Sequence, residues 1–174
     1  MEIEAKFQVP GEEVLRRLAE ATQLAGFPLS GGNVENLSDT YLDTARWLIL
    51  AAGYACRRRV SYGRILITLK QLRGADEVVY RREEFEVDLA EDLPPEEWPD
   101  SPAWTKVLEI IGDQSLAEVL DLRQTRITRL VGTEENPVAE LALDEVHLRG
   151  SNIPDDDRTS SEADTHFFEV EVEL

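Results

Sequence analysis

Three pairs of carboxylates are spaced so that each pair could contribute to one cation site. Each pair has the pattern Glu-x-Glu, and the pairs are Glu2 with Glu4, Glu84 with Glu86, and Glu169 with Glu171. Residues two apart on a β-strand project from the same face of a sheet. Three such pairs facing one another would repel strongly unless a cation lay among them. Carboxylate oxygens suit hard divalent cations, so these pairs indicate Mg²⁺ or Mn²⁺.

Basic residues gather in one segment of an otherwise acidic chain. The formal net charge is −18, from 18 Lys and Arg against 36 Asp and Glu. Eight of those 18 basic residues lie between Arg57 and Arg82. Arginine is favoured where phosphate oxygens accept two parallel hydrogen bonds. Anion-binding bases beside cation-binding acids are the combination that phosphoryl transfer uses.

The composition narrows the class of protein. A chain of 174 residues, 42% hydrophobic and 31% charged, is typical of one globular domain, which we expect to span 1–174. Its acidity disfavours nucleic acid as a partner. The single cysteine, Cys56, excludes an internal disulfide framework and a cysteine-rich zinc site. We see neither a signal-peptide pattern nor a run of 18 apolar residues, so we expect no membrane partner and a cytoplasmic location.

Hydrophobic periodicity predicts about eight strands and a few helices. Strict alternation over 2–9 predicts the first strand, and helical spacing of apolar residues predicts a helix over 12–25. Two short helices are predicted within 91–122, and the polar, acidic segment 149–165 is predicted to be a mobile loop. The remaining strands are predicted at 34–43, 54–62, 64–71, 79–89, 123–132, 138–148 and 166–174.

Alternation within these strands separates charged from apolar residues. An open sheet could satisfy this pattern by packing its apolar face on the helices and exposing its charged face, where weak cross-strand salt bridges would form. A closed barrel could satisfy it with the charged face inside, which would also remove the sheet edges. The acidic pairs and the clustered arginines favour the second arrangement. The predicted fold class is therefore α+β: an eight-stranded antiparallel closed β-barrel, a tunnel with a charged lumen and helices packed outside.

A series of motifs follows the order of the predicted strands. The first, Glu2-Ile3-Glu4-Ala5-Lys6, is similar to the E-x-E-x-K signature that opens a known family, the CYTH superfamily, also called the triphosphate tunnel metalloenzymes. The later elements resemble the family's motifs in the same order, namely Asp39 to Thr44, Gly53 to Arg59, Leu66 to Lys70, Arg82 to Glu86, Leu143-Asp144, and Phe168 to Glu171. The resemblance implies an eight-stranded antiparallel tunnel with helices outside.

The resemblance also implies roles for individual residues. Glu2, Glu4 and Lys6 would be catalytic. The phosphate-binding residues would be Lys6, Arg57, Arg59, Lys70, Arg82 and Arg126. The ligands of Mg²⁺ or Mn²⁺ would be Glu2, Glu4, Glu84, Glu86, Asp144, Glu169 and Glu171, where Glu84 and Glu86 could instead hold the basic residues in place. One position departs from the family, because Gln124 stands where a basic residue is common; Arg123 or Arg129 could compensate.

Three hypotheses for the function remain open at this point. The first is a metal-dependent hydrolase of a small-molecule triphosphate, with inorganic tripolyphosphate as the leading substrate because no element specific for an organic group is evident. The second is a class IV adenylate cyclase that makes cyclic AMP and pyrophosphate from ATP. The third is a polyphosphate- or nucleotide-binding module without turnover. A homodimer is left open, and the isolated His147 and His166 are not expected to bind metal.

Overall fold

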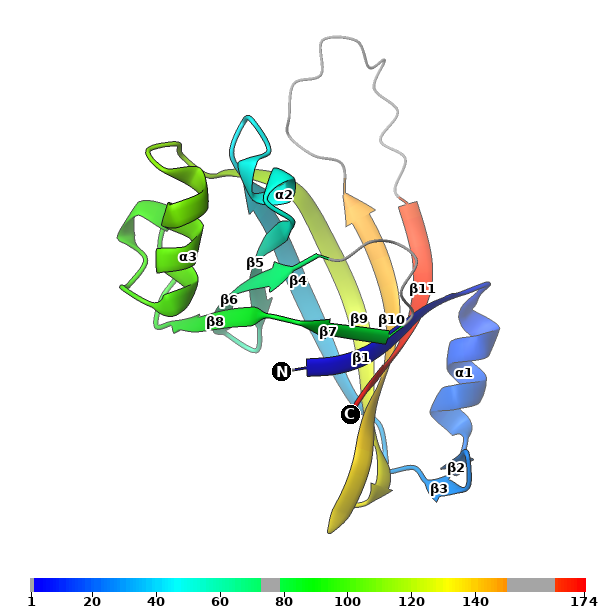
Figure 1. Cartoon of the computed structure of the whole chain (residues 1–174). Helices are drawn as coiled ribbons and strands as arrows, with labels where there is room; N and C mark the ends of the chain where they lie inside the picture. The colour runs from blue at the N-terminus through cyan, green and yellow to red at the C-terminus, as the bar shows by residue number, and fades with distance from the viewer. Residues whose placement is uncertain (1, 73–78, 150–164) are drawn as a thin grey trace.

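Antiparallel β-structure dominates the computed structural model of the chain, which describes residues 2–72, 79–149 and 165–174 (Figure 1). The side chains of Glu2, of residues 79–82 and of Arg149 are outside this description. The segment predicted as a mobile loop lies, from residue 150 to 164, outside the described residues as well. Among the described helices, none has both the length and the apolar composition that a membrane span requires.

Nine strands form one sheet in the order β7-β1-β11-β10-β9-β4-β5-β6-β8. Their bounds are β1 (Glu2–Val9), β4 (Asn33–Asp43), β5 (Tyr54–Ser61), β6 (Arg64–Gln71), β7 (Val79–Arg82), β8 (Glu84–Leu89), β9 (Ala117–Thr133), β10 (Asn136–Arg149) and β11 (Thr165–Glu173). Two further strands of two residues each, β2 (Gln23–Leu24) and β3 (Phe27–Pro28), pair with each other. All neighbouring pairs are antiparallel.

The two ends of this sheet are consecutive in the chain. Only Glu83 separates β7 from β8, and its carbonyl oxygen accepts a hydrogen bond of 3.0 Å from the backbone N–H of Gln71. The strand predicted at 79–89 is thus one run of chain whose first half pairs with β1 and whose second half pairs with β6. The curled sheet comes back on itself through this run, which crosses in front of the long strands in Figure 1. A ladder that closes the barrel along its whole length is not among the pairings of the described residues.

Helices cover the convex, apolar face of the sheet. Helix α1 (Glu12–Glu20) lies over β10 and β11, while α2 (Leu48–Ala51) and α3 (Pro102–Ile111) lie over the opposite part of the sheet, as Figure 1 shows. A short 3₁₀ helix, η1 (Pro95–Glu97), precedes α3. One core cluster contains Leu15, Val131, Leu141, Leu143 and Val170. The other contains Leu42, Ile49, Cys56, Ile65, Ile67, Leu69, Leu89, Trp98, Val107 and Ile111.

The curl of the sheet and the direct connection of its two end strands, β7 and β8, favour the barrel over the open sheet. Because the apolar side chains pack outward against the helices, the residues of opposite parity turn toward the concave side of the curled sheet. The predicted charged interior with outer helices is therefore confirmed. The predicted number of eight strands holds when β7 and β8 are counted as one strand.

The first helix ends at Glu20 rather than at residue 25, because Gln23 and Leu24 pair with the following segment as β2 and β3, and a buried arginine binds the last turn of the helix. Nη1 of Arg129, on β9, donates to the carbonyl oxygens of Leu18 at 2.7 Å and Ala19 at 2.9 Å. Its Nε and Nη2 donate to the carbonyl oxygen of Ser30 at 2.8 and 2.6 Å. A cation at the carboxyl end of a helix satisfies carbonyl groups that have no partner within the helix. The chain then turns at Ala25 and Gly26, which both have positive φ.

One predicted helix is wrong and one observed helix was not predicted. Residues 117–122, whose apolar spacing favoured a helix, belong to β9, because β4 extends far enough to pair with them, as in Tyr41 opposite Leu120. Helix α2 has only four residues and depends on Asp43. The Asp43 carboxylate accepts hydrogen bonds from the backbone N–H groups of Thr44, Ile49 and Leu50 at 2.7, 2.9 and 2.9 Å.

Cys56 should be chemically inert in the folded protein. Its side chain is 1% exposed, and burial, together with the negative charge of Asp43, raises the pKa of its thiol to about 12. Only the thiolate reacts with disulfide reagents. We expect no labelling by 5,5′-dithiobis(2-nitrobenzoate) at pH 8 in native protein and one equivalent in guanidinium chloride. Fast stoichiometric labelling of the native protein would contradict the buried position.

Candidate active site

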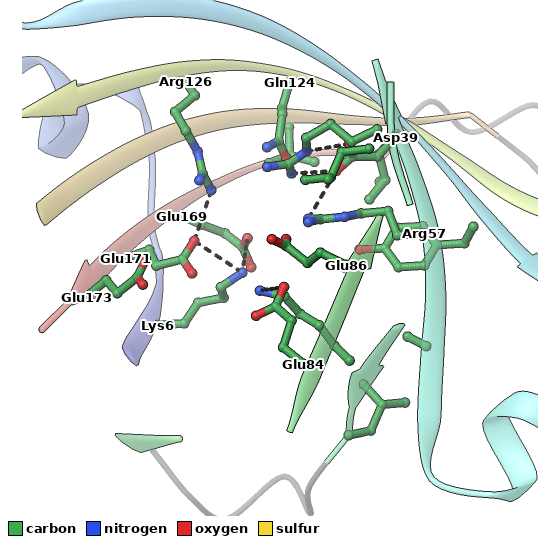
Figure 2. A pocket seen from close by; sticks show the side chains of 18 of the residues that line it. Lys6, Asp39, Arg57, Glu84, Glu86, Gln124, Arg126, Glu169, Glu171 and Glu173 are labelled. Atoms are coloured by element: carbon green, nitrogen blue, oxygen red, sulfur yellow. Dashed lines mark hydrogen bonds and ion pairs between the residues drawn. The ribbon is translucent and has the colours of Figure 1, made fainter. Parts of the chain in front are cut away.

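The concave face of the sheet encloses a cavity of about 660 Å³, a volume common for small-molecule sites. Side chains from β1, β4, β5, β6, β8, β9, β10 and β11 line it. The basic ones are Lys6, Arg57, Arg59, Lys70 and Arg126, and the acidic ones are Asp39, Glu84, Glu86, Glu169, Glu171 and Glu173. Figure 2 shows that the charged ends of Lys6, Arg57, Glu86 and Glu169 point from different strands into the same space. Charges that are far apart in the sequence therefore meet in one cavity.

Four carboxylates gather where β1, β11, β10 and β9 lie side by side, and we call Glu4, Asp144, Glu169 and Glu171 the acidic corner. The strand register sets Lys6 opposite Glu171 and Asp144 opposite Glu169. Nζ of Lys6 lies 3.5 Å from Glu171 and 3.8 Å from Glu169. Glu4 and Asp144 are each 1% exposed, so the corner reaches beneath the cavity surface.

Arg126 holds two members of the acidic corner. Its Nε and Nη2 donate to both oxygens of Asp144 at 2.8 and 2.7 Å, and Nη2 also donates to Glu171 at 2.9 Å. These contacts use two of the three guanidinium nitrogens, so among the contacts of the described residues Nη1 remains for a further acceptor. The predicted phosphate ligand Arg126 and the predicted metal ligand Asp144 are thus partners of each other.

The two glutamates of β11 have pKa values shifted in opposite directions. Burial alone would raise the pKa of Glu171, but a hydrogen bond with Glu4 and the charges of Lys6 and Arg126 outweigh it and hold that pKa well below its ordinary value. Burial raises the pKa of Glu169, and the nearby Asp144 and Glu171 raise it further against the opposing effect of Lys6. The negative charge of Glu169 is therefore unfavourable in the acidic corner, whereas that of Glu171 is stabilised.

The donor set of the acidic corner fits a hard divalent cation. All four side chains offer carboxylate oxygens, the ligands that Mg²⁺ and Mn²⁺ take in proteins. A hydrogen bond joins the carboxyl groups of Glu4 and Glu171, so two of these donors lie in contact. Glu2 and Arg82 pair in the backbone register of β1 and β7, but their predicted site roles fall on side chains outside the described residues.

Two arginines of β5 form the opposite, basic wall together with Asp39. Nε and Nη2 of Arg59 donate to the two oxygens of Asp39 at 2.7 and 2.6 Å, and Nη1 of Arg57 lies 3.6 Å from the same carboxylate. Asp39 is 1% exposed and was not among the predicted site residues. Its position directly opposite Arg59 on the neighbouring strand is the signal that could have identified it, once β4 and β5 were known to pair.

Glu84 and Glu86 reach the cavity from β8, across from the acidic corner. Nζ of Lys70 lies 3.1 Å from Glu84, and Oγ1 of Thr68 donates to Glu86 at 3.4 Å. In Figure 2, Glu86 and Glu169 extend toward each other from opposite walls. Of the two roles implied for this pair, the contact with Lys70 supports a positioning role for Glu84.

Gln124 and an apolar patch occupy another part of the cavity lining. The Gln124 side chain is buried, and its Nε2 has no hydrogen-bond partner among the described residues. The neighbouring lining is apolar and consists of Leu122, Val146 and Phe167. The expected compensation for Gln124 is wrong on both counts, because Arg129 binds α1 on the outer face and Arg123 is an exposed residue that does not line the cavity.

The antiparallel sheet is curled, carries acids and bases on its concave face and has helices outside. These features define the class of fold, a domain with a charged tunnel. The sequence profile of the CYTH domain family matches residues 1–174, and the chain belongs to this family. The resemblance inferred from the motifs is thereby confirmed.

Solved structures agree in fold. HpAC1 of Hippeastrum is described as a candidate adenylyl cyclase with a dominant triphosphatase activity. It is 20% identical to this chain, with a TM-score of 0.67 over 100% of this chain and 80% of HpAC1. A candidate adenylate cyclase of Bacillus halodurans is 19% identical with a TM-score of 0.68 and the same coverage. The PH1819 protein of Pyrococcus horikoshii is 21% identical with a TM-score of 0.53 over 98% and 77%. No curated protein matches the sequence significantly.

Proposed function

We propose that the protein is a metal-dependent hydrolase of a small-molecule triphosphate. One observation carries the proposal: five basic side chains and two carboxylates of the acidic corner, Glu169 and Glu171, line one cavity of about 660 Å³ in a chain with net charge −18. A bound polyanion needs the bases, and a cation-free anion site would bind better without the acids. Membership of the CYTH family supports an enzyme that acts on a triphosphate.

The basic residues would bind and straighten the phosphate chain. Lys6, Arg57, Arg59, Lys70 and Arg126 come from four different strands, so together they can contact successive phosphoryl groups. The buried Nε of Arg57 has no hydrogen-bond partner among the described residues, so this donor is available to the oxygens of a bound ligand. Fixing an extended triphosphate among immobile charges lowers the barrier by positioning and by charge neutralisation.

The acidic corner would hold the metal. Glu4, Asp144, Glu169 and Glu171, joined by Glu2 on the strength of the family motif, are the proposed ligands of Mg²⁺ or Mn²⁺. When bound, such an ion polarises phosphoryl oxygens and neutralises their charge. Glu86, which extends from the opposite wall, would accept a proton from the water that attacks the terminal phosphorus. The new P–O bond forms as the bridging P–O bond breaks, and the diphosphorylated product departs.

A second candidate is favoured by the apolar patch beside Gln124. Leu122, Val146 and Phe167 offer a surface for an organic group at one part of a cavity that is otherwise charged. An organic triphosphate would fit this division, either as a hydrolase substrate or as ATP in an adenylate cyclase. The names of HpAC1 and of the Bacillus halodurans protein give the same two activities for structural neighbours.

Product analysis separates these reactions. Purified protein is incubated with tripolyphosphate, ATP or thiamine triphosphate and with Mg²⁺ or Mn²⁺, beside a Glu4→Gln variant, and ³¹P NMR resolves the products. We expect orthophosphate with the diphosphorylated product, lost in the variant and without metal. Pyrophosphate with cyclic AMP would identify a cyclase. Binding without any product would identify the non-catalytic module and overturn both enzymatic proposals.

Glu169→Gln should stabilise the metal-free protein at neutral pH. Because the pKa of Glu169 is raised, the folded state binds more protons than the unfolded state between the ordinary carboxyl pKa and the raised one, so stability falls as pH increases through that window. Glutamine removes this penalty. We expect a higher Tm than wild type at pH 7, no difference at pH 3, and a smaller Tm gain on adding Mg²⁺. A lower Tm at pH 7 in chelator would contradict the assigned repulsion.

A further inference from the structure

Three polar residues with metal-binding side chains meet on the outer face of the sheet. Glu145 and His147 lie on β10, and His166 lies directly opposite His147 on β11. Their neighbours Val146 and Phe167 line the tunnel cavity, so alternation turns Glu145, His147 and His166 away from it. The cluster is thus separate from the acidic corner, although both depend on the same two strands.

The geometry brings three ligand atoms together. One oxygen of Glu145 lies 3.0 Å from Nε2 of His166 and 3.5 Å from Nε2 of His147. The two imidazole rings are stacked with centroids 4.3 Å apart and planes 8° apart. One potential ligand atom from each residue lies within 4.8 Å of the others. Phe168 contacts His166 edge to face, with centroids 4.6 Å apart, which restrains that ring.

The donor atoms of this cluster suit a transition metal better than they suit Mg²⁺. Metal–nitrogen bonds of about 2.0–2.1 Å place two imidazole nitrogens roughly 3 Å apart around one Zn²⁺ ion. Imidazole favours Zn²⁺, Ni²⁺ and Cu²⁺, whereas Mg²⁺ and Mn²⁺ favour oxygen ligands. The three side chains are between 39% and 48% exposed, so an ion and its remaining water ligands can approach.

We propose that Glu145, His147 and His166 form a second metal site, which binds a transition-metal ion of the Zn²⁺ class through two imidazoles and one carboxylate. Its three ligands leave at least one coordination position open to water. The ion would join β10 to β11 from the outside, while the tunnel would bind a hard cation inside. The expectation that neither histidine binds metal is replaced by this proposal.

Imidazole signals give a direct test, because the chain contains only two histidines. The untagged, ¹⁵N-labelled full chain is titrated with Zn²⁺ in excess Mg²⁺, which competes for the carboxylates of the tunnel. We expect the ring signals of both histidines to change together and to saturate at one equivalent. Unchanged signals up to millimolar Zn²⁺, or two signals that titrate independently, would overturn the proposal.

Variants distinguish a shared site from two separate histidines. His166→Ala and Glu145→Gln should each weaken Zn²⁺ binding at the remaining histidine by at least about tenfold, since ligand loss costs no less than the loss of an outer partner. Glu169→Gln, inside the tunnel, should leave the Zn²⁺ affinity of the histidines unchanged. Equal affinity in wild type and His166→Ala would show that no shared ion is bound. Each of the three variants replaces a polar side chain on a strand, and far-UV circular dichroism checks that each variant is folded.

Discussion

Replacing Glu171 with glutamine is expected to lower kcat/KM for triphosphate hydrolysis by at least about 100-fold, the loss that follows removal of one preorganised electrostatic group. Glu171 contacts Lys6 and Arg126 and shares a hydrogen bond with Glu4, so it joins the proposed metal ligands to the proposed phosphate ligands. Glutamine retains the shape but has no negative charge. Both cation binding and the orientation of the two bases should suffer.

The measurement is kcat/KM as a function of Mg²⁺ concentration, with the substrate that product analysis identifies. A metal ligand predicts that high Mg²⁺ restores part of the lost activity, whereas a residue that only supports the fold predicts no such recovery. Glu140→Gln is the matched control, because Glu140 lies on the adjacent strand β10 but is exposed and does not line the cavity. Near-normal activity of Glu171→Gln, or equal losses in both variants, would refute the assigned role.

The largest expected effect on stability comes from Arg129→Met. Arg129 is 5% exposed and donates four hydrogen bonds to the carbonyl oxygens of Leu18, Ala19 and Ser30. Methionine leaves these partly buried carbonyl groups without their donor, and an unsatisfied buried group costs about 1–3 kcal/mol. We expect the free energy of unfolding in urea to fall by about 3 kcal/mol, with fraying of α1 rather than damage to the tunnel.

Arg123→Met on the same strand is the matched control. Arg123 is exposed, and the same loss of charge and change of shape there should alter the free energy of unfolding by less than about 0.5 kcal/mol. Hydrogen exchange adds a local measurement: amides of 12–20 should lose protection in Arg129→Met alone. Similar stability for the two variants would mean that water or another group readily replaces the guanidinium.

The inward face of each strand was predictable because alternation is a local property. Side chains two apart share a face whatever the neighbouring strand is, so Lys6, Arg57 and Glu171 could each be assigned to the charged face of their strand before any pairing was known. Helix α3 was also accessible, since apolar spacing after Pro102 is preserved in the fold. The family motifs then supplied the closed order of strands that alternation alone left open.

The remaining errors arise from contacts between distant segments. Residues 117–122 have helical spacing, yet the extended edge of β4 offers them a ladder of hydrogen bonds that local propensity cannot anticipate. Arg129 was a candidate phosphate ligand because its charge is evident from the sequence. Its partners, the end of α1 and Ser30, are evident only from the fold. Asp39 was overlooked for the same reason, since its importance comes from Arg59 on the next strand.

The pairing of β1 with β11 has a consequence for how the protein matures. Glu4 stands opposite Glu173, and the backbone N–H of Leu174 donates to the carbonyl oxygen of Ile3 at 2.9 Å, so contacts of very high sequence separation build the acidic corner. Such high contact order slows folding, and a chain emerging from the ribosome exposes β1 without its partner until nearly all of the domain has been made. The acidic corner should therefore form only once β11 has been made, in a late step of folding.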